Sequence, residues 1–317
     1  MPEFKTACRF LKPEDVLKLK SYEFAPRMMV EGYFAGMHRS AHKGQSADFF
    51  DYREYSHGDD IRSVDWKVFA RSDKYFVRLF EQYTDMVCYV FLDSSASMGY
   101  GQPFQKIEYC SFFAAALSYL IIRQGDLVSL TISDDAIREH FPPGSTHRHL
   151  TNILNCLERN RPRARTNLAE VLLRASPMLK KRGILIVISD LLDNLGTFFT
   201  ALNPYLHRGF EVMIFHVLHP DELSLPPRGY VQFEDMETGQ RLNTDSDAIL
   251  KSYTRAVEQA RLNARALSIR KRIAYTFAST QTHYFNLFDE FTAKRGRRGG
   301  TWMGGNRMSW GRPAGGR

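Results

Sequence analysis

The sequence predicts an α/β protein with a mostly parallel central sheet and helices on both faces. Two observations predict this fold class: apolar runs of strand length alternate with stretches of helical spacing, and the runs are apolar throughout instead of at every second residue. Continuously apolar strands are typical of sheets buried on both sides. The chain is long enough for a sizeable core, because 44% of its 317 residues are hydrophobic and only 25% are charged.

The first half of the pattern is a β-α-β unit followed by a paired strand. The predicted elements are, in order, a strand at 87–92 that runs into Asp93, a helix at 106–123, a strand at 126–132 and a short strand at 136–141. The turn Ser133-Asp134-Asp135 should reverse the chain before the short strand. Pro142, Pro143 and Gly144 should end that strand.

The second half repeats the alternation and adds an insertion. The predicted elements are helices at 147–158 and 167–181, a strand at 184–189 that runs into Asp190, a helix at 197–208, a strand at 211–218, a hairpin insertion at about 228–244, a long helix at 247–271, a strand at 273–279 and a helix at 283–294. The turn within the insertion is expected at Glu237-Thr238-Gly239.

Composition divides the chain into three parts. Residues 1–83 form an N-terminal segment, residues 84–294 form the α/β domain, and residues 295–317 form a tail rich in Gly and Arg. The tail holds six of the 43 Lys and Arg residues and no acid, so the rest of the chain carries 37 basic and 35 acidic residues. We expect the tail to be disordered. Its arginines and two tryptophans leave nucleic-acid binding as an alternative.

Other features indicate a cytoplasmic protein. The N-terminus lacks the apolar region of a signal peptide, and the apolar run at residues 86–92 is far too short to span a bilayer. The four cysteines are scattered without paired spacing, as expected of reduced thiols rather than of a disulfide or zinc framework.

Oxygen-bearing side chains follow two of the predicted strands. Asp93 opens the pattern Asp93-x-Ser95-x-Ser97, and Asp190 follows the strand at 184–189. Thr166 lies at the start of the helix that precedes the second of these strands. Ligands of open parallel sheets bind outside the carboxyl ends of the strands, and hard oxygen donors favour Mg²⁺ (or Mn²⁺) over zinc. Taken alone, Asp93 and Ser97 could instead be local caps.

Asp93, Ser95, Ser97, Thr166 and Asp190, in this order on an α/β chain, resemble the metal-ion-dependent adhesion site of the von Willebrand factor type A domain. The resemblance implies a Rossmann-like type A fold. It also implies that the three hydroxyls and two carboxylates hold a divalent cation directly or through water, with one open position for an acidic side chain of a partner. Arg165 departs from the pattern, because many type A domains have glycine before the threonine.

A second resemblance narrows the first. Residues 44–49, then Tyr52-Arg53-Glu54-Tyr55 and the block at 58–71, resemble the signature of the bacterial domain of unknown function 58 family, with coverage from Leu17 to Lys294. That family has a von Willebrand-like domain behind a family-specific N-terminal segment. Its members often occur alongside MoxR-type AAA+ ATPases. The resemblance therefore implies an adaptor or chaperone-like partner of such an ATPase.

The block at 58–71 has two interpretations. Its clustered acids could form a metal or partner site, but the loop pattern of calcium sites is absent. We favour a structural role, in which Arg62 and Arg71 pair with these acids around a buried Trp66.

The enzyme alternatives match the residues less well. A serine hydrolase would need Gly-x-Ser-x-Gly and a histidine base, and Ser95 stands where the first glycine is required. An aspartyl-phosphate enzyme would need a second acid two residues after Asp93, and no P-loop is present. We therefore predict a non-enzymatic, metal-dependent binding protein, with a metal-dependent phosphohydrolase or nucleic-acid binding by the tail as alternatives.

Overall fold

The computed structural model describes seven stretches of the chain: residues 9–20, 47–55, 64–72, 74–82, 86–163, 165–226 and 229–288. The predicted tail at 295–317 and the second half of the predicted last helix lie outside these residues, and residues 285–288 are helical.

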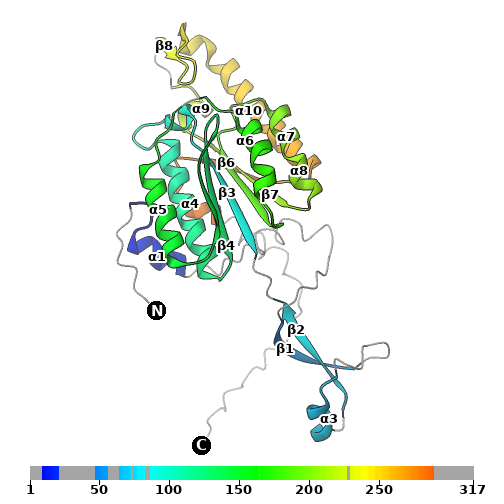
Figure 1. Cartoon of the computed structure of the whole chain (residues 1–317). Helices are drawn as coiled ribbons and strands as arrows, with labels where there is room; N and C mark the ends of the chain where they lie inside the picture. The colour runs from blue at the N-terminus through cyan, green and yellow to red at the C-terminus, as the bar shows by residue number, and fades with distance from the viewer. Residues whose placement is uncertain are drawn as a thin grey trace, which may run out of the picture.

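A six-stranded sheet forms the centre of the body (Figure 1). Its strands are β3 (Val87–Asp93), β4 (Leu127–Ser133), β5 (Ile137–Gly144), β6 (Ile184–Ser189), β7 (Glu211–Leu218) and β10 (Ala274–Ser279). They lie in the order β10-β7-β6-β3-β4-β5, and only the edge strand β5 is antiparallel to its neighbour. This is the Rossmann-type order, so the predicted α/β class and mostly parallel sheet are confirmed.

The strands are continuously apolar because both faces of the sheet are covered. Along β3, Cys88, Val90 and Leu92 belong to one core cluster, and the alternate residues belong to another. The first cluster lies under α1 (Pro13–Lys20), α4 (Lys106–Arg123) and α5 (His147–Arg159). The second lies under α6 (Leu168–Ala175), α7 (Leu195–Ala201), α8 (Asn203–His207) and α10 (Ser246–Arg270).

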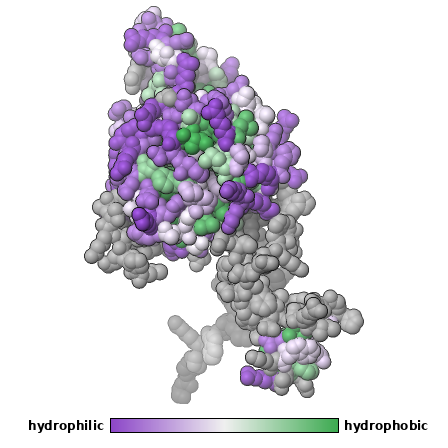
Figure 2. Space-filling model, in the orientation of Figure 1, coloured by the Kyte–Doolittle hydropathy of each residue, from purple (hydrophilic) through white to green (hydrophobic). Residues whose placement is uncertain are grey.

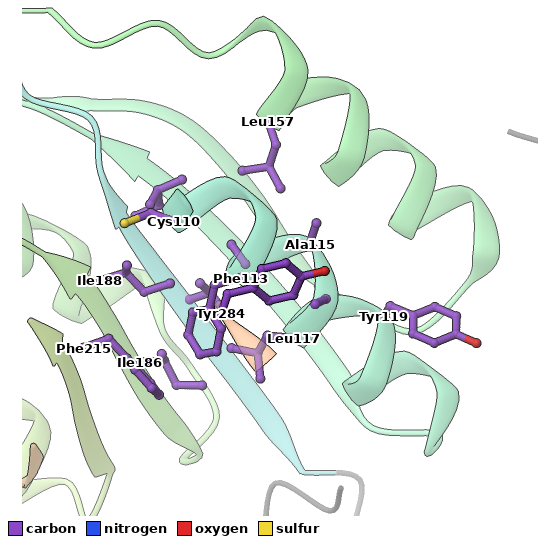
Figure 3. Close-up of a cluster of buried hydrophobic side chains, with 14 of the residues drawn as sticks. Cys110, Phe113, Ala115, Leu117, Tyr119, Leu157, Ile186, Ile188, Phe215 and Tyr284 are labelled. Atoms are coloured by element: carbon purple, nitrogen blue, oxygen red, sulfur yellow. The ribbon is translucent and has the colours of Figure 1, made fainter. Parts of the chain in front are cut away.

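Helix α4 is the centre of the first cluster. Figure 3 shows its Phe113 and Leu117 together with Ile186 and Phe215 of the sheet. The rings of Phe113 and Phe215 have their centroids 4.6 Å apart. Because α4 begins directly after the loop that follows β3, this packing also fixes the start of α4 at the carboxyl edge of the sheet.

Two predicted helices are interrupted at proline. The helix expected at 167–181 ends at Ala175 and continues as the short 3-10 turn η3 (Ser176–Met178), which contains Pro177. The helix expected at 197–208 is divided into α7 and α8, and Pro204 lies in the first turn of α8. Proline lacks the N–H that a continuous helix needs at these positions. Pro142 and Pro143, by contrast, do not end β5, because an edge strand with bulges tolerates them.

The insertion is a separate two-stranded hairpin. Strands β8 (Tyr230–Glu234) and β9 (Arg241–Asp245) pair with each other in antiparallel register. The short helix α9 (Pro220–Leu223) links β7 to this region and was not predicted. In Figure 1 the hairpin projects beyond α9, on the side of the body where β3 and β6 end.

The N-terminal segment contributes a second small unit and one helix of the body. Strands β1 (Ala47–Glu54) and β2 (Phe76–Gln82) form a hairpin that carries α3 (Trp66–Ser72). Trp66 is 55% exposed, so the expected buried tryptophan was wrong, since α3 packs Phe69 on Tyr75 instead. Most of the acids of the 58–71 block and Arg62 lie outside the described residues. Helix α1 packs on α4, and Phe10, three residues before α1, meets Phe112 of α4 edge to face.

The exposed surface of the described residues is mainly polar, as expected when the apolar residues are buried between the sheet and its helices. The face shown in Figure 2 is mainly hydrophilic, with scattered hydrophobic residues. Across the described stretches, every helix is too short or too polar to cross a bilayer.

Candidate metal and partner-binding site

The candidate site lies at the switch point of the sheet. From β3 the chain proceeds outward through β4 and β5 and then returns to β6 on the other side of β3. The carboxyl ends of β3 and β6 are therefore adjacent, and the loops that follow them diverge. Asp93 ends the first strand and Asp190 follows the second, so the structure brings together the two acids that the sequence places 97 positions apart.

The loop after β3 turns its hydroxyl groups toward each other. Ser95 Oγ and Ser97 Oγ are 3.1 Å apart, and both residues are buried. The loop then forms the 3-10 turn η2 (Ala96–Gly99) and reverses at Gly101, whose φ of +119° suits glycine alone. Gly99, the other glycine of this loop, has no positive φ.

Asp93 is a buried carboxylate that has no basic partner in the part of the chain that the structure describes. Its side chain accepts hydrogen bonds from Ser95 N at 3.0 Å and from Ser189 Oγ at 2.6 Å. Burial and, after it, the nearby charge of Asp190 raise the pKa of Asp93 to about 6, although these hydrogen bonds oppose the shift. The ionised form of Asp93 is therefore poorly stabilised in the metal-free protein, and a bound cation would stabilise it.

Lys106 is fully buried beside the second acid. Its Nζ lies 2.7 Å from Asp190 Oδ2 and 2.5 Å from Glu222 Oε1, and the side chains of Lys106 and Asp190 are wholly inaccessible to solvent. Burial lowers the pKa of Lys106, but the two carboxylates outweigh that effect and raise it. Glu222 is positioned by α9, where its other oxygen accepts from His219 N at 2.8 Å.

Backbone geometry directs Asp190 inward. The next residue, Leu191, has a φ of +52° although it is neither glycine nor asparagine. Its N–H is bound by Ser189 Oγ at 3.0 Å, the same hydroxyl that donates to Asp93. Ser189 thus links the ends of β3 and β6. The strained backbone at Leu191 directly follows Asp190, where the chain leaves β6.

Thr166 lies on a third loop, before α6. Its N–H donates to Glu237 Oε1 at 3.3 Å, a carboxylate from the hairpin insertion. Among the described residues, the hydrogen bonds do not join the Thr166 hydroxyl to the other four predicted ligands. The backbone at Arg165 has no positive φ, so its conformation does not require glycine at this position. The Nε atom of Arg165 lies 3.4 Å from the carbonyl oxygen of Glu237.

The donor set fits a small divalent cation. Two neighbouring ligands of an octahedral ion with bonds of about 2.1 Å lie about 3.0 Å apart, and the two serine hydroxyls are 3.1 Å apart. Lys106 pairs with Asp190 and Glu222, and Asp93 lies close to Asp190 with no ion pair of its own among the described residues. Three carboxylates thus share one ammonium group, so with all three ionised the cluster is short of two positive charges. Elsewhere in the described stretches, as here, no three His, Cys, Asp or Glu side chains converge to hold a metal. A cation would therefore depend on hydroxyl groups and water as well as on acids.

Comparison with known proteins places the chain in a family. The family described as "Protein of unknown function DUF58" matches residues 51–263, which is two thirds of the chain. This protein belongs to the DUF58 family. The match includes the whole of β3, the loop with both serines, Thr166 and Asp190, and the family resemblance of the sequence is confirmed.

Curated relatives of this DUF58 protein occur in mycobacteria. "Uncharacterized protein Rv1480" of Mycobacterium tuberculosis and "Uncharacterized protein Mb1516" of Mycobacterium bovis are each 26% identical over 232 residues, which cover 72% of both chains. Among solved structures, similarity extends to the protein BatB from Bacteroides thetaiotaomicron, with 16% identity and a TM-score of 0.44 over 67% of this chain and 99% of that chain. An aerotolerance-related membrane protein from Bacteroides fragilis has 15% identity and a TM-score of 0.43 over the same shares.

Sequence reasoning missed four residues of the site. They are Lys106, Ser189, Glu222 and Glu237. The sequence offered a clue to two of them. Lys106 lies in the first turn of a helix, where a positive charge is unfavourable next to the helix dipole, and Glu222 follows a third strand, β7, at the same edge of the sheet. Glu237 carried none, because its contact depends on where the hairpin lies.

Proposed function

We propose that this DUF58 protein is a non-enzymatic adaptor that binds a protein partner through a divalent cation, Mg²⁺ or Mn²⁺. The residues that would hold the cation are Asp93, Ser95, Ser97, Thr166 and Asp190. The observation that supports this most is the pair of converging hydroxyls beside Asp93, a buried acid that no basic side chain of the described stretches neutralises. When bound, the cation would supply the positive charge that the cluster lacks and a coordination position for an acidic side chain of the partner.

We further propose that the partner is a MoxR-type AAA+ ATPase. Membership of the DUF58 family supports this, because the family resemblance implies association with such ATPases. The role of the adaptor would be to present the cation site at the carboxyl edge of the sheet, between the loops that follow β3 and β6.

A metal-dependent phosphohydrolase is the weaker alternative. Ser95 holds the position where that chemistry needs a second acid, and Lys106 cannot reach a phosphoryl group because it is buried between two carboxylates. Two histidines lie near this edge. His216 is buried beside Asp190, and its Nδ1 lies 2.7 Å from the Tyr275 hydroxyl. His219 packs its ring on Tyr100 and accepts a hydrogen bond from Asp221 N. These contacts support structural roles for both.

The test is binding to a purified MoxR-type ATPase. Ser97→Ala should weaken binding by at least about tenfold, which corresponds to about 1.4 kcal/mol, because it removes one hydroxyl ligand. The comparison is made by interferometry at constant Mg²⁺, since the ATPase itself uses magnesium. Ser118→Ala is the matched control: Ser118 is also buried, but its hydroxyl donates within α4 to Ala114 O. Equal binding by wild type and Ser97→Ala would contradict the proposal.

A further inference from the structure

The tip of the β8–β9 hairpin contacts two loops of the candidate site. On the threonine loop, Thr166 N donates to the Glu237 carboxylate at 3.3 Å, and Arg165 Nε approaches the Glu237 carbonyl oxygen at 3.4 Å. On the serine loop, a β-carbon built on Gly99 would lie 3.5 Å from the terminal methyl group of Met236. The hairpin tip therefore bridges the loops that are expected to hold the cation.

The tip is folded so that it presents one side chain. Asp235 accepts hydrogen bonds from Glu237 N at 2.8 Å and from Thr238 Oγ1 at 2.6 Å, and Gly239 N donates back to Asp235 O at 2.8 Å. Of residues 235–240, all of which the structure describes, only Glu237 is partly buried and the rest are exposed. The turn thus holds a single carboxylate against the site.

The rest of the hairpin makes few packing contacts with the body. Its two strands pair only with each other, and Tyr230 and Leu242 are 78% and 62% exposed. Figure 1 shows the hairpin standing clear of the central sheet. Isolated two-stranded hairpins are marginally stable, and segments with few buried contacts open at low cost. Contacts at the tip are therefore expected to decide whether the hairpin rests on the site.

We infer that the hairpin tip is a built-in ligand of the candidate site, and that the partner displaces it with an acidic side chain presented on a turn of its own. The inference rests on the proposed function and adds to it the chemistry of the partner and the identity of its competitor. Electrostatics support it: the Asp190 carboxylate acts repulsively on Glu237, and a cation placed between these acids would turn that repulsion into attraction.

The probe for this inference is a fluorescent peptide of residues 229–246, closed by a disulfide between cysteines added at its ends. Its binding to the full chain is measured by anisotropy in Mn²⁺. Wild type should bind it weakly because its own tip fills the site, and Glu237→Gln should bind it about tenfold more tightly if the tip occupies nine-tenths of wild-type molecules. Glu234→Gln is the matched control, because Glu234 lies on the same hairpin but pairs with the exposed Arg241.

A separate Mn²⁺ titration of the same samples distinguishes the two levels of the account. If wild type and Glu237→Gln bind Mn²⁺ but bind the peptide equally, or not at all, the built-in ligand is overturned and the adaptor proposal is not. If neither binds Mn²⁺, both are overturned. A peptide that carries glutamine in place of Glu237 should fail to bind any of the proteins, and its binding would also contradict the inference.

Discussion

Asp93→Asn is expected to stabilise the metal-free protein above pH 6 and to abolish its response to Mg²⁺. The wild-type carboxylate is buried, its hydrogen bonds do not offset the cost of its charge, and its pKa is raised to about 6. The amide is neutral at every pH. It can still accept from Ser95 N and can donate to Ser189 Oγ, which has lone pairs for both this bond and the one from Leu191.

The sign of the pH dependence follows from this raised pKa. Below the unfolded pKa of about 3.9, wild type is protonated in both states, so it should match the variant. Between these pH values and about pH 6, the folded wild type still holds the proton that its unfolded chain has lost. Each rise in pH therefore favours the unfolded state, and stability falls until the folded carboxyl also ionises near pH 6. Above pH 6 the variant should be more stable by up to about 3 kcal/mol.

The measurement is urea unfolding from pH 4 to pH 8 in chelator and in Mg²⁺. At 100 times the dissociation constant, Mg²⁺ should stabilise wild type by about 2.7 kcal/mol and leave the variant unchanged. Asp247→Asn is the control, because it removes an equal charge from an exposed position on α10. If Asp93→Asn were less stable than wild type in chelator at pH 8 and stabilised equally by Mg²⁺, this account of Asp93 would be wrong.

Lys106→Met is expected to destabilise the metal-free protein by about 3–5 kcal/mol, the usual cost of removing one partner of a buried ion pair. Methionine has a similar length but leaves the carboxylates of Asp190 and Glu222 buried without a counter-charge. Because Mg²⁺ would then be the sole positive charge in the cluster, it should stabilise this variant more than wild type. Thermal and urea unfolding with and without Mg²⁺ measure both effects.

Two further variants keep this prediction testable if Lys106→Met does not fold. Lys106→Met combined with Glu222→Gln removes one of the two stranded charges and should recover part of the loss. Lys180→Met, which removes a lysine from the exposed surface, should change stability little. A Lys106→Met protein as stable as wild type in chelator would show that the buried ammonium does not balance these acids.

The sheet could be predicted from the sequence because each strand is read locally. The run ending at Asp93 and the run before Asp190 are apolar throughout, and the helices between them fix a parallel arrangement with both acids at one edge. Helix ends were harder to predict, since Pro177 and Pro204 allow either a continued helix or a break, and packing decides between them. Trp66 was misjudged because nothing local reveals that α3 lies on an isolated hairpin.

The candidate site was predicted only as far as its oxygen donors. Asp93, Ser95 and Ser97 are close in the chain, so a motif reveals them. Lys106 meets Asp190 from a position 84 residues away, and Glu222 reaches Lys106 from α9, a helix that was not predicted. Glu237 reaches Thr166 from the insertion, 71 residues away. Such residues have no common pattern in the sequence, because only the closed sheet and its loops bring them together.

The most direct test of the central claim is anomalous diffraction from crystals of the full chain soaked in Mn²⁺. The account predicts one strong peak at bonding distance from Ser95 Oγ and Ser97 Oγ, beside Asp190, and predicts that the same peak is absent from Asp93→Asn crystals. Saturating Mn²⁺ that gives no peak at these hydroxyls, with Lys106 still paired to an otherwise unchanged Asp190, would contradict it.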